Sequence, residues 1–159
     1  MFDKIKRIKD VRLLNATLKE ARLKLLHEHA VENEINALAI YHDFESERKV
    51  KEALIVQGVL GKVVQQSDLG LMNEKINILR NEEANLAIEH QDRKAEERQA
   101  YSQWLESVEL RKHSQRKVDK LNVVCEMENE KHLMKVQYQE DMELEEFKAI
   151  SNILDGIDE

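Results

Sequence analysis

Proline is absent from all 159 residues of this chain, and only four residues are glycine. A proline inside a helix removes a backbone hydrogen bond and clashes with the preceding turn, so its complete absence favours long, uninterrupted helices. Because 36% of the residues are charged and only 4% are aromatic, the composition argues against a thick globular core. It favours helices that each bury one narrow apolar stripe.

The first expected helix covers about residues 2–60 and carries an apolar stripe at coiled-coil spacing. The stripe consists of Val11, Leu14, Leu18, Ala21 and Leu25. It then continues one residue out of phase, at Val31, Ile35, Leu38 and Tyr41. Such a break changes the supercoil locally without ending the helix. These positions are expected to form a seam with a second helix.

The expected turn covers about residues 58–68, which hold Gly58, Gly61 and few charges. Ser67 or Asp68 can accept a hydrogen bond from the free amides at the start of the next helix. The apolar stripe then resumes at Leu69, Met72, Ile76 and Leu79. A second helix is therefore expected over about residues 68–153. Its seam is expected to pack weakly between residues 87 and 99, where almost nothing is apolar.

The two ends of the chain carry opposite charges. Residues 1–25 hold eight bases and three acids, whereas residues 126–159 hold three bases and eleven acids. An antiparallel hairpin brings these ends together, whereas a parallel dimer, the main alternative, would place like charges side by side. The sequence therefore predicts an all-α fold. It is a single elongated coiled-coil hairpin over residues 1–159, with two long antiparallel helices of which the second is longer. Replacing Leu18 or Leu121 by Asp is expected to melt it by burying an unpaired charge.

No catalytic, cofactor or metal site is recognised in the sequence. Glycine-rich phosphate loops and paired cysteines are missing. His27 and His29 flank Glu28, but a zinc-protease helix needs its second histidine at position 31, which is Val31. The three residues are interpreted as solvated helix surface. We expect a protein that is not an enzyme.

Charge and hydropathy restrict the class of partner. The net charge of -7 argues against nucleic acid, which requires clustered Lys and Arg. No run of about 18 apolar residues is present, so insertion into a membrane is not expected, and the start lacks the apolar core of a secretory signal. A cytoplasmic location and a protein partner are expected.

Two aromatic positions leave two interpretations open. Tyr41 and Phe44 lie three residues apart on one face of the first helix, where they either fill the seam or form a partner-binding patch. The acidic segment 138–147 is likewise either a solvated face or a site for a basic partner.

Three segments carry a resemblance to a known family. They are residues 5–12 (IKRIKDVR), residues 68–69 followed by 76–86 (INILRNEEANL), and residues 138–147 (YQEDMELEEF). In order, spacing and total length the chain resembles the YscO-type proteins of bacterial type III secretion systems, which are relatives of the flagellar protein FliJ. The likeness covers essentially the whole chain.

The resemblance implies a non-enzymatic central stalk at the cytoplasmic base of the secretion apparatus, monomeric when free. Its implied partners are the hexameric secretion ATPase, the cytoplasmic ring of the export gate and export chaperones. By this likeness, the residues that face the ATPase are Ile5, Arg7, Ile8, Val11, Arg12, Tyr138, Glu145, Glu146 and Phe147. Those that face the gate are Tyr41, Phe44, Leu69, Met72, Ile76 and Leu79. The alternative is a generic cytoplasmic coiled-coil scaffold or dimeric adaptor unrelated to secretion.

Overall fold

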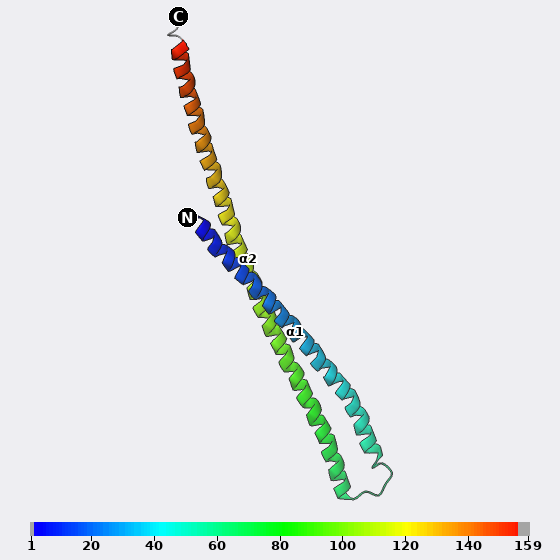
Figure 1. Ribbon diagram of the computed structural model, residues 1–159. Coiled ribbons are helices and arrows are strands. Elements are labelled where there is room, and N and C mark those ends of the chain that lie inside the picture. The colour runs from blue at the N-terminus through cyan, green and yellow to red at the C-terminus, as the bar shows by residue number, and fades with distance from the viewer. Residues whose placement is uncertain (1, 156–159) are drawn as a thin grey trace. The chain divides into compact units, whose positions relative to one another are not determined.

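The computed structural model describes residues 2–155 of the chain. Two helices, α1 (Phe2–Gln57) and α2 (Gln66–Asp155), account for all of this range except the connection 58–65, and no strand occurs within it (Figure 1). Helix α1 has 56 residues and α2 has 90. The predicted all-α helical hairpin, with the second helix longer than the first, is confirmed.

The chain divides into two compact units. The terminal unit joins residues 2–16 of α1 with residues 111–155 of α2. The tip unit comprises residues 17–110, which include the connection between the helices. In each unit a segment of α1 packs against a segment of α2.

The connection ends one helix and starts the next through specific backbone contacts. The Gly58 amide donates to the Leu54 carbonyl at 3.0 Å, and Gly61 adopts a φ of 79°, a left-handed conformation that glycine accommodates without steric cost. At the start of α2, Asp68 Oδ2 accepts a hydrogen bond from the Gln65 amide at 3.1 Å, while the Asp68 amide donates to the Gln65 carbonyl at 3.0 Å. Asp68 therefore lies in the first turn of α2, and its carboxylate accepts from the residue that precedes the helix. The expectation that Ser67 or Asp68 caps the helix is wrong, because α2 already begins at Gln66.

The seam of the tip unit follows three-and-four spacing on both helices and mixes apolar residues with polar and charged ones. On α1 its buried and half-buried positions include Glu20, Leu23, His27, Ala30, Glu34, Ala37, Tyr41, Phe44 and Arg48. On α2 they include Met72, Ile76, Leu79, Glu83, Leu86, His90, Arg93, Glu97, Ala100, Trp104 and Ser107. Met72, Ile76 and Leu79 therefore lie in the seam as predicted, whereas Leu69 is exposed.

The predicted seam of α1 is wrong over residues 11–25, whereas Val31, Leu38 and Tyr41 of its predicted continuation are half-buried. Val11, Leu14, Leu18 and Leu25 are each more than half exposed, and Ala21 and Ile35 are exposed as well. At about 100° per residue, this stripe lies nearly opposite the true seam on the helix surface. The most buried positions of the true seam on α1 are the small residues Ala16 and Ala37.

The most buried apolar residues of the terminal unit are Ala16 on α1 and Val118 and Leu121 on α2. Lys9 Nζ also donates to the Lys117 carbonyl, which joins the two helices at 3.5 Å. Beyond Cys125, every residue of α2 up to residue 150 is exposed except Val136, which is half-buried. The last part of α2 that the structure describes therefore has almost no cover from α1.

Candidate interaction surfaces

Two histidine–glutamate pairs cross the seam of the tip unit. His27 Nε2 of α1 lies 3.0 Å from Glu97 Oε1 of α2, and His90 Nε2 of α2 lies 2.8 Å from Glu34 Oε1 of α1. All four side chains are at most one-quarter exposed. Burial of a polar group is tolerated when it has a hydrogen-bond partner, so each pair allows the helices to pack where apolar residues are missing.

His27 also belongs to an aromatic cluster with two residues of α2. Its ring stacks on that of Trp104, with centroids 5.6 Å apart and planes 13° apart, and it tilts against Tyr101 at 5.3 Å. The interpretation of residues 27–29 as solvated surface is therefore correct for Glu28 and His29 and wrong for His27. The stacked Trp104 contributes the apolar burial that His27 lacks.

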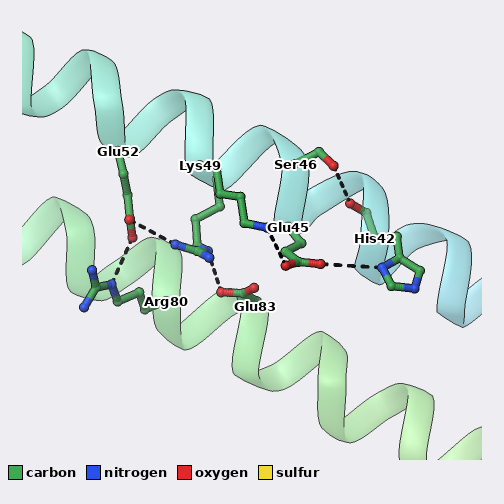
Figure 2. Close-up of polar contacts among 8 residues, drawn as sticks. His42, Glu45, Ser46, Lys49, Glu52, Arg80 and Glu83 are labelled. Carbon is green, nitrogen blue, oxygen red and sulfur yellow. Dashed lines mark hydrogen bonds and ion pairs between the residues drawn. The ribbon is translucent and has the colours of Figure 1, made fainter.

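A charged network closer to the connection also joins the two helices (Figure 2). Arg48 of α1 contacts Glu52 at 3.0 Å and Glu83 of α2 at 2.5 Å, while Arg80 of α2 contacts Glu52 at 2.9 Å. Glu52 thus lies between two guanidinium groups. The hydrogen bond from Arg80, followed by the bond and charge of Arg48, lowers the pKa of the Glu52 carboxyl below its usual 4.5, and Glu52 raises the pKa of Arg48.

A second carboxylate in Figure 2 is held on α1 alone. Lys49 Nζ donates to Glu45 Oε1 at 2.7 Å, and this bond is the largest cause of the lowered pKa of Glu45, with His42 contributing from the other side. These residues are four and three positions from Glu45, the spacing at which helix side chains meet. The contacts of Glu45 therefore stabilise α1 itself.

The described residues were compared with what a metal site and a membrane-spanning helix require. Among the residues described, no three His, Cys, Asp or Glu side chains gather closely enough to hold a metal ion. No helix within residues 2–155 contains an apolar stretch of the length and hydropathy that crossing a bilayer requires.

The predicted ATPase-facing residues all lie in the terminal unit, and all are exposed. On α1 they are Ile5, Arg7, Ile8, Val11 and Arg12, and on α2 they are Tyr138, Glu145, Glu146 and Phe147. Tyr138 and Phe147 are 67% and 72% exposed, which is unusual for aromatic residues. Between these α1 and α2 residues, the described part of the chain has no hydrogen bond or ion pair, so the structure brings neither group to the other.

The predicted gate-facing residues lie in the tip unit, and five of the six are seam residues. Tyr41, Phe44, Met72, Ile76 and Leu79 are half-buried, so the interpretation that the two aromatics fill the seam is supported. Only Leu69 is exposed.

The sequence analysis missed other exposed apolar residues beside this seam. Leu54 and Ile78 are 61% and 57% exposed. They line a groove of about 400 Å³ between the two helices, together with Ile55, Leu79, Lys51 and Lys75. Leu54 lies on α1 and Ile78 on α2, so their shared groove depends on how the two helices align.

Comparison with known proteins gives one clear match. The family model described as type III secretion protein YscO matches residues 2–150. The comparisons with curated proteins and with solved structures yield no match. Because the family model covers nearly the whole chain, the resemblance carried by residues 5–12, 68–69 with 76–86, and 138–147 is confirmed. This chain belongs to the YscO family of type III secretion proteins.

Proposed function

We propose that this chain is a non-enzymatic stalk of a type III secretion export apparatus, acting at its cytoplasmic base. In this proposal the terminal unit inserts into the hexameric secretion ATPase, and the tip unit contacts the export gate and export chaperones. Membership of the YscO family supports a role in secretion. The finer assignment rests on the exposed surfaces of the two units.

The proposed ATPase contact is supported mainly by the exposure of the last part of α2, residues 126–150. Large apolar residues there are exposed in a helix that receives almost no packing from α1. They are Met127, Leu133, Met134, Tyr138, Met142, Leu144, Phe147 and Ile150. Long helices in proteins owe most of their stability to packing of an apolar face, and exposed apolar surface of this extent marks an interaction site. A partner protein that covers this face would supply the missing burial.

The chemistry of the terminal unit suits a ring of subunits that present more than one kind of surface. Residues 5–12 of α1 expose apolar side chains between bases such as Arg7 and Arg12, whereas residues 138–147 of α2 expose aromatics between acids. In this proposal the basic start of α1 and the acidic last part of α2 contact successive subunits of the ring differently. That difference is what coupling between subunits requires.

The test is co-purification of the chain with the hexameric ATPase of the same secretion system, with ATP hydrolysis measured in its presence and absence. We expect binding that changes the hydrolysis rate. The variants Arg7→Glu/Arg12→Glu and Tyr138→Ala/Phe147→Ala are each expected to abolish both effects. The matched control is Lys62→Glu/Val63→Ser, which changes the same kinds of exposed residue in the connection. If a helical chain shows neither binding nor an effect on hydrolysis, the ATPase assignment is wrong.

One observation favours the dimeric adaptor as a second candidate. The exposed stripe Val11, Leu14, Leu18, Ala21 and Leu25 keeps coiled-coil spacing, so it could form a seam with another helix. Sedimentation equilibrium separates the two candidates. If the measured mass stays at that of one chain over a hundredfold range of concentration, the stalk is supported. If the chain is a dimer and the Leu18→Glu variant is a monomer, the adaptor is supported.

A further inference from the structure

The groove beside the seam of the tip unit has an apolar floor and a lysine from each helix. Helix α1 contributes Lys51, Leu54 and Ile55, and helix α2 contributes Lys75, Ile78 and Leu79. Leu54, Ile55 and Lys75 also line an adjoining hollow that continues towards the connection, where Asp68 is its only acidic residue. The two hollows therefore share three lining residues.

The lysines of the groove are available to an incoming partner. Lys75 has no ion pair or hydrogen bond with any side chain in the range that the structure describes. Lys51 pairs with Glu47 at 3.1 Å on the same helix, where both side chains are more than half exposed, and its ammonium lies 5.9 Å from the Phe44 ring centroid. An exposed pair of this kind contributes little, so a better-placed carboxylate can displace it.

The shape of the groove selects the backbone of the occupant. Both walls are helices, which have no free strand edge, so a partner cannot add a β-strand here. The lining residues include no aromatic side chain, which polyproline ligands need. A third helix, laid along the groove with its apolar stripe on Leu54 and Ile78, fits between two helices by ordinary helix packing.

The charge of the groove selects the surface of the occupant. A second copy of this chain related by two-fold symmetry would use the same patch on both sides of the interface, which would bring Lys51 and Lys75 of both copies together. Acidic residues flanking the apolar stripe of a different helix would instead meet one lysine on each side. The chain as a whole has a net charge of -7, whereas the two charged residues that line this hollow are both lysines, so the hollow attracts negative charge locally.

We infer that this groove, formed by Lys51, Leu54, Ile55, Lys75, Ile78 and Leu79, binds an acidic amphipathic helix of a partner protein. The inference rests on the proposed function, because it names the class of partner for the tip contact with the gate or a chaperone. It also moves that contact from the half-buried residues Tyr41 and Phe44 to exposed residues beside them.

The test uses two fluorescent synthetic helical peptides with the same leucine stripe, flanked by Glu in one and by Lys in the other. Binding to the full chain is measured by fluorescence anisotropy at low salt. We expect the Glu peptide to bind and Lys51→Glu/Lys75→Glu to weaken it at least tenfold. The same variant is expected to bind the Lys peptide at least tenfold more tightly than the unaltered chain does. Leu54→Ser/Ile78→Ser is expected to weaken the Glu peptide with helicity unchanged, since both residues are exposed.

Two control variants locate the binding. Lys62→Glu/Val63→Ser changes an exposed lysine and an exposed apolar residue outside the groove and is expected to leave binding of the Glu peptide unchanged. Arg7→Glu/Arg12→Glu removes the basic face of the first residues and is expected to leave it unchanged too. Equal binding of both peptides, or binding that depends on Arg7 and Arg12 and not on Lys51 and Lys75, overturns the inference.

Two further readouts separate the possible failures. Dimerisation of the chain that Leu54→Ser/Ile78→Ser abolishes would assign the groove to a second copy and overturn the inference. Stimulation of the secretion ATPase is measured with the same groove variants and is expected to be unchanged, because none of these residues lies in the terminal unit. If the unaltered chain stimulates the ATPase but does not bind the Glu peptide, the groove assignment alone is refuted. If the unaltered chain binds the Glu peptide but does not stimulate the ATPase, the stalk assignment alone is refuted.

Discussion

Leu121 and Leu18 have the same side chain and opposite surroundings, so they give the sharpest test of where the helices pack. Leu121 of α2 is 8% exposed in the terminal unit, whereas Leu18 of α1 is 60% exposed in the tip unit. Replacing each by Ala removes the same three carbon atoms. The difference in the free energy of unfolding between the two variants therefore reports burial.

The expected magnitudes follow from the buried surface. Each buried carbon atom with its hydrogens contributes about 0.8 kcal/mol, so the loss of three of them in Leu121→Ala should cost about 2 kcal/mol. That value is at the low end for core leucines, about 2–5 kcal/mol, because a seam open to solvent on both sides can close around the change. For Leu18, less than half of the residue is covered, and Ala has the higher helix propensity, so the cost should be below about 1 kcal/mol.

The assay is urea unfolding followed by circular dichroism at 222 nm, with the free energy taken from the midpoint and slope. Leu14→Ala is the control, because Leu14 lies in the same unit as Leu121 and is 57% exposed. It should behave like Leu18→Ala. If Leu18→Ala costs as much as Leu121→Ala, the seam of α1 lies on the apolar stripe at residues 11–25 and the packing described above is wrong.

Three other predictions concern the polar contacts and the connection. Arg80 and Arg48 lower the pKa of the Glu52 carboxyl, so the ionised form of Glu52 stabilises the fold above a pH of about 4.5. This stabilisation is lost as the pH falls through the lowered pKa of the folded state. The decline in melting temperature below pH 4.5 should therefore be smaller in Glu52→Gln than in the unaltered chain. His27→Ala should cost at least about 1 kcal/mol more than His29→Ala in urea unfolding, since only His27 contacts Trp104 and Glu97, and equal costs would contradict the seam. Gly61→Ala should cost about 1 kcal/mol, because alanine is strained at a φ of 79°; an unchanged midpoint would show that the connection can adjust.

Much of the fold could be predicted from residues alone. The absence of proline, the glycines at positions 58 and 61, and Asp68 near the start of the second stripe suffice to predict two long helices and the place where they join. Helix formation and its interruption are local properties of the backbone, so the sequence carries them directly.

The seam of α1 could not be predicted from apolar spacing, because the apolar spacing marks a different face. Leu18 and Leu25 repeat regularly but are exposed, whereas the seam uses Ala30, Glu34 and His27. A polar residue in a seam is recognisable only through its partner on the other helix, and that partner is dozens of positions away. The signal that was present is chemical complementarity: each seam histidine of one helix has a glutamate opposite it on the other.

One of the two candidate surfaces could be predicted from the sequence, and the other could not. The exposure of Tyr138 and Phe147 agrees with the family-based expectation of an interaction site in segment 138–147, because that segment lies where α1 provides almost no cover. The groove at Leu54 and Ile78 depends on how two distant segments align, and apolar periodicity does not encode this.

The crossed histidine–glutamate pairs also determine how far one helix can slide along the other. If α2 slipped by one heptad in one direction, His27 would meet His90 and Glu34 would meet Glu83, and a slip in the other direction would bring Glu34 to Glu97. Each misalignment places like groups together in a partly desolvated seam, whereas a uniform leucine seam would tolerate all three alignments. The tip unit thus gives up some stability for a single register, and a rod with one register can transmit a push or a twist along its length without slipping.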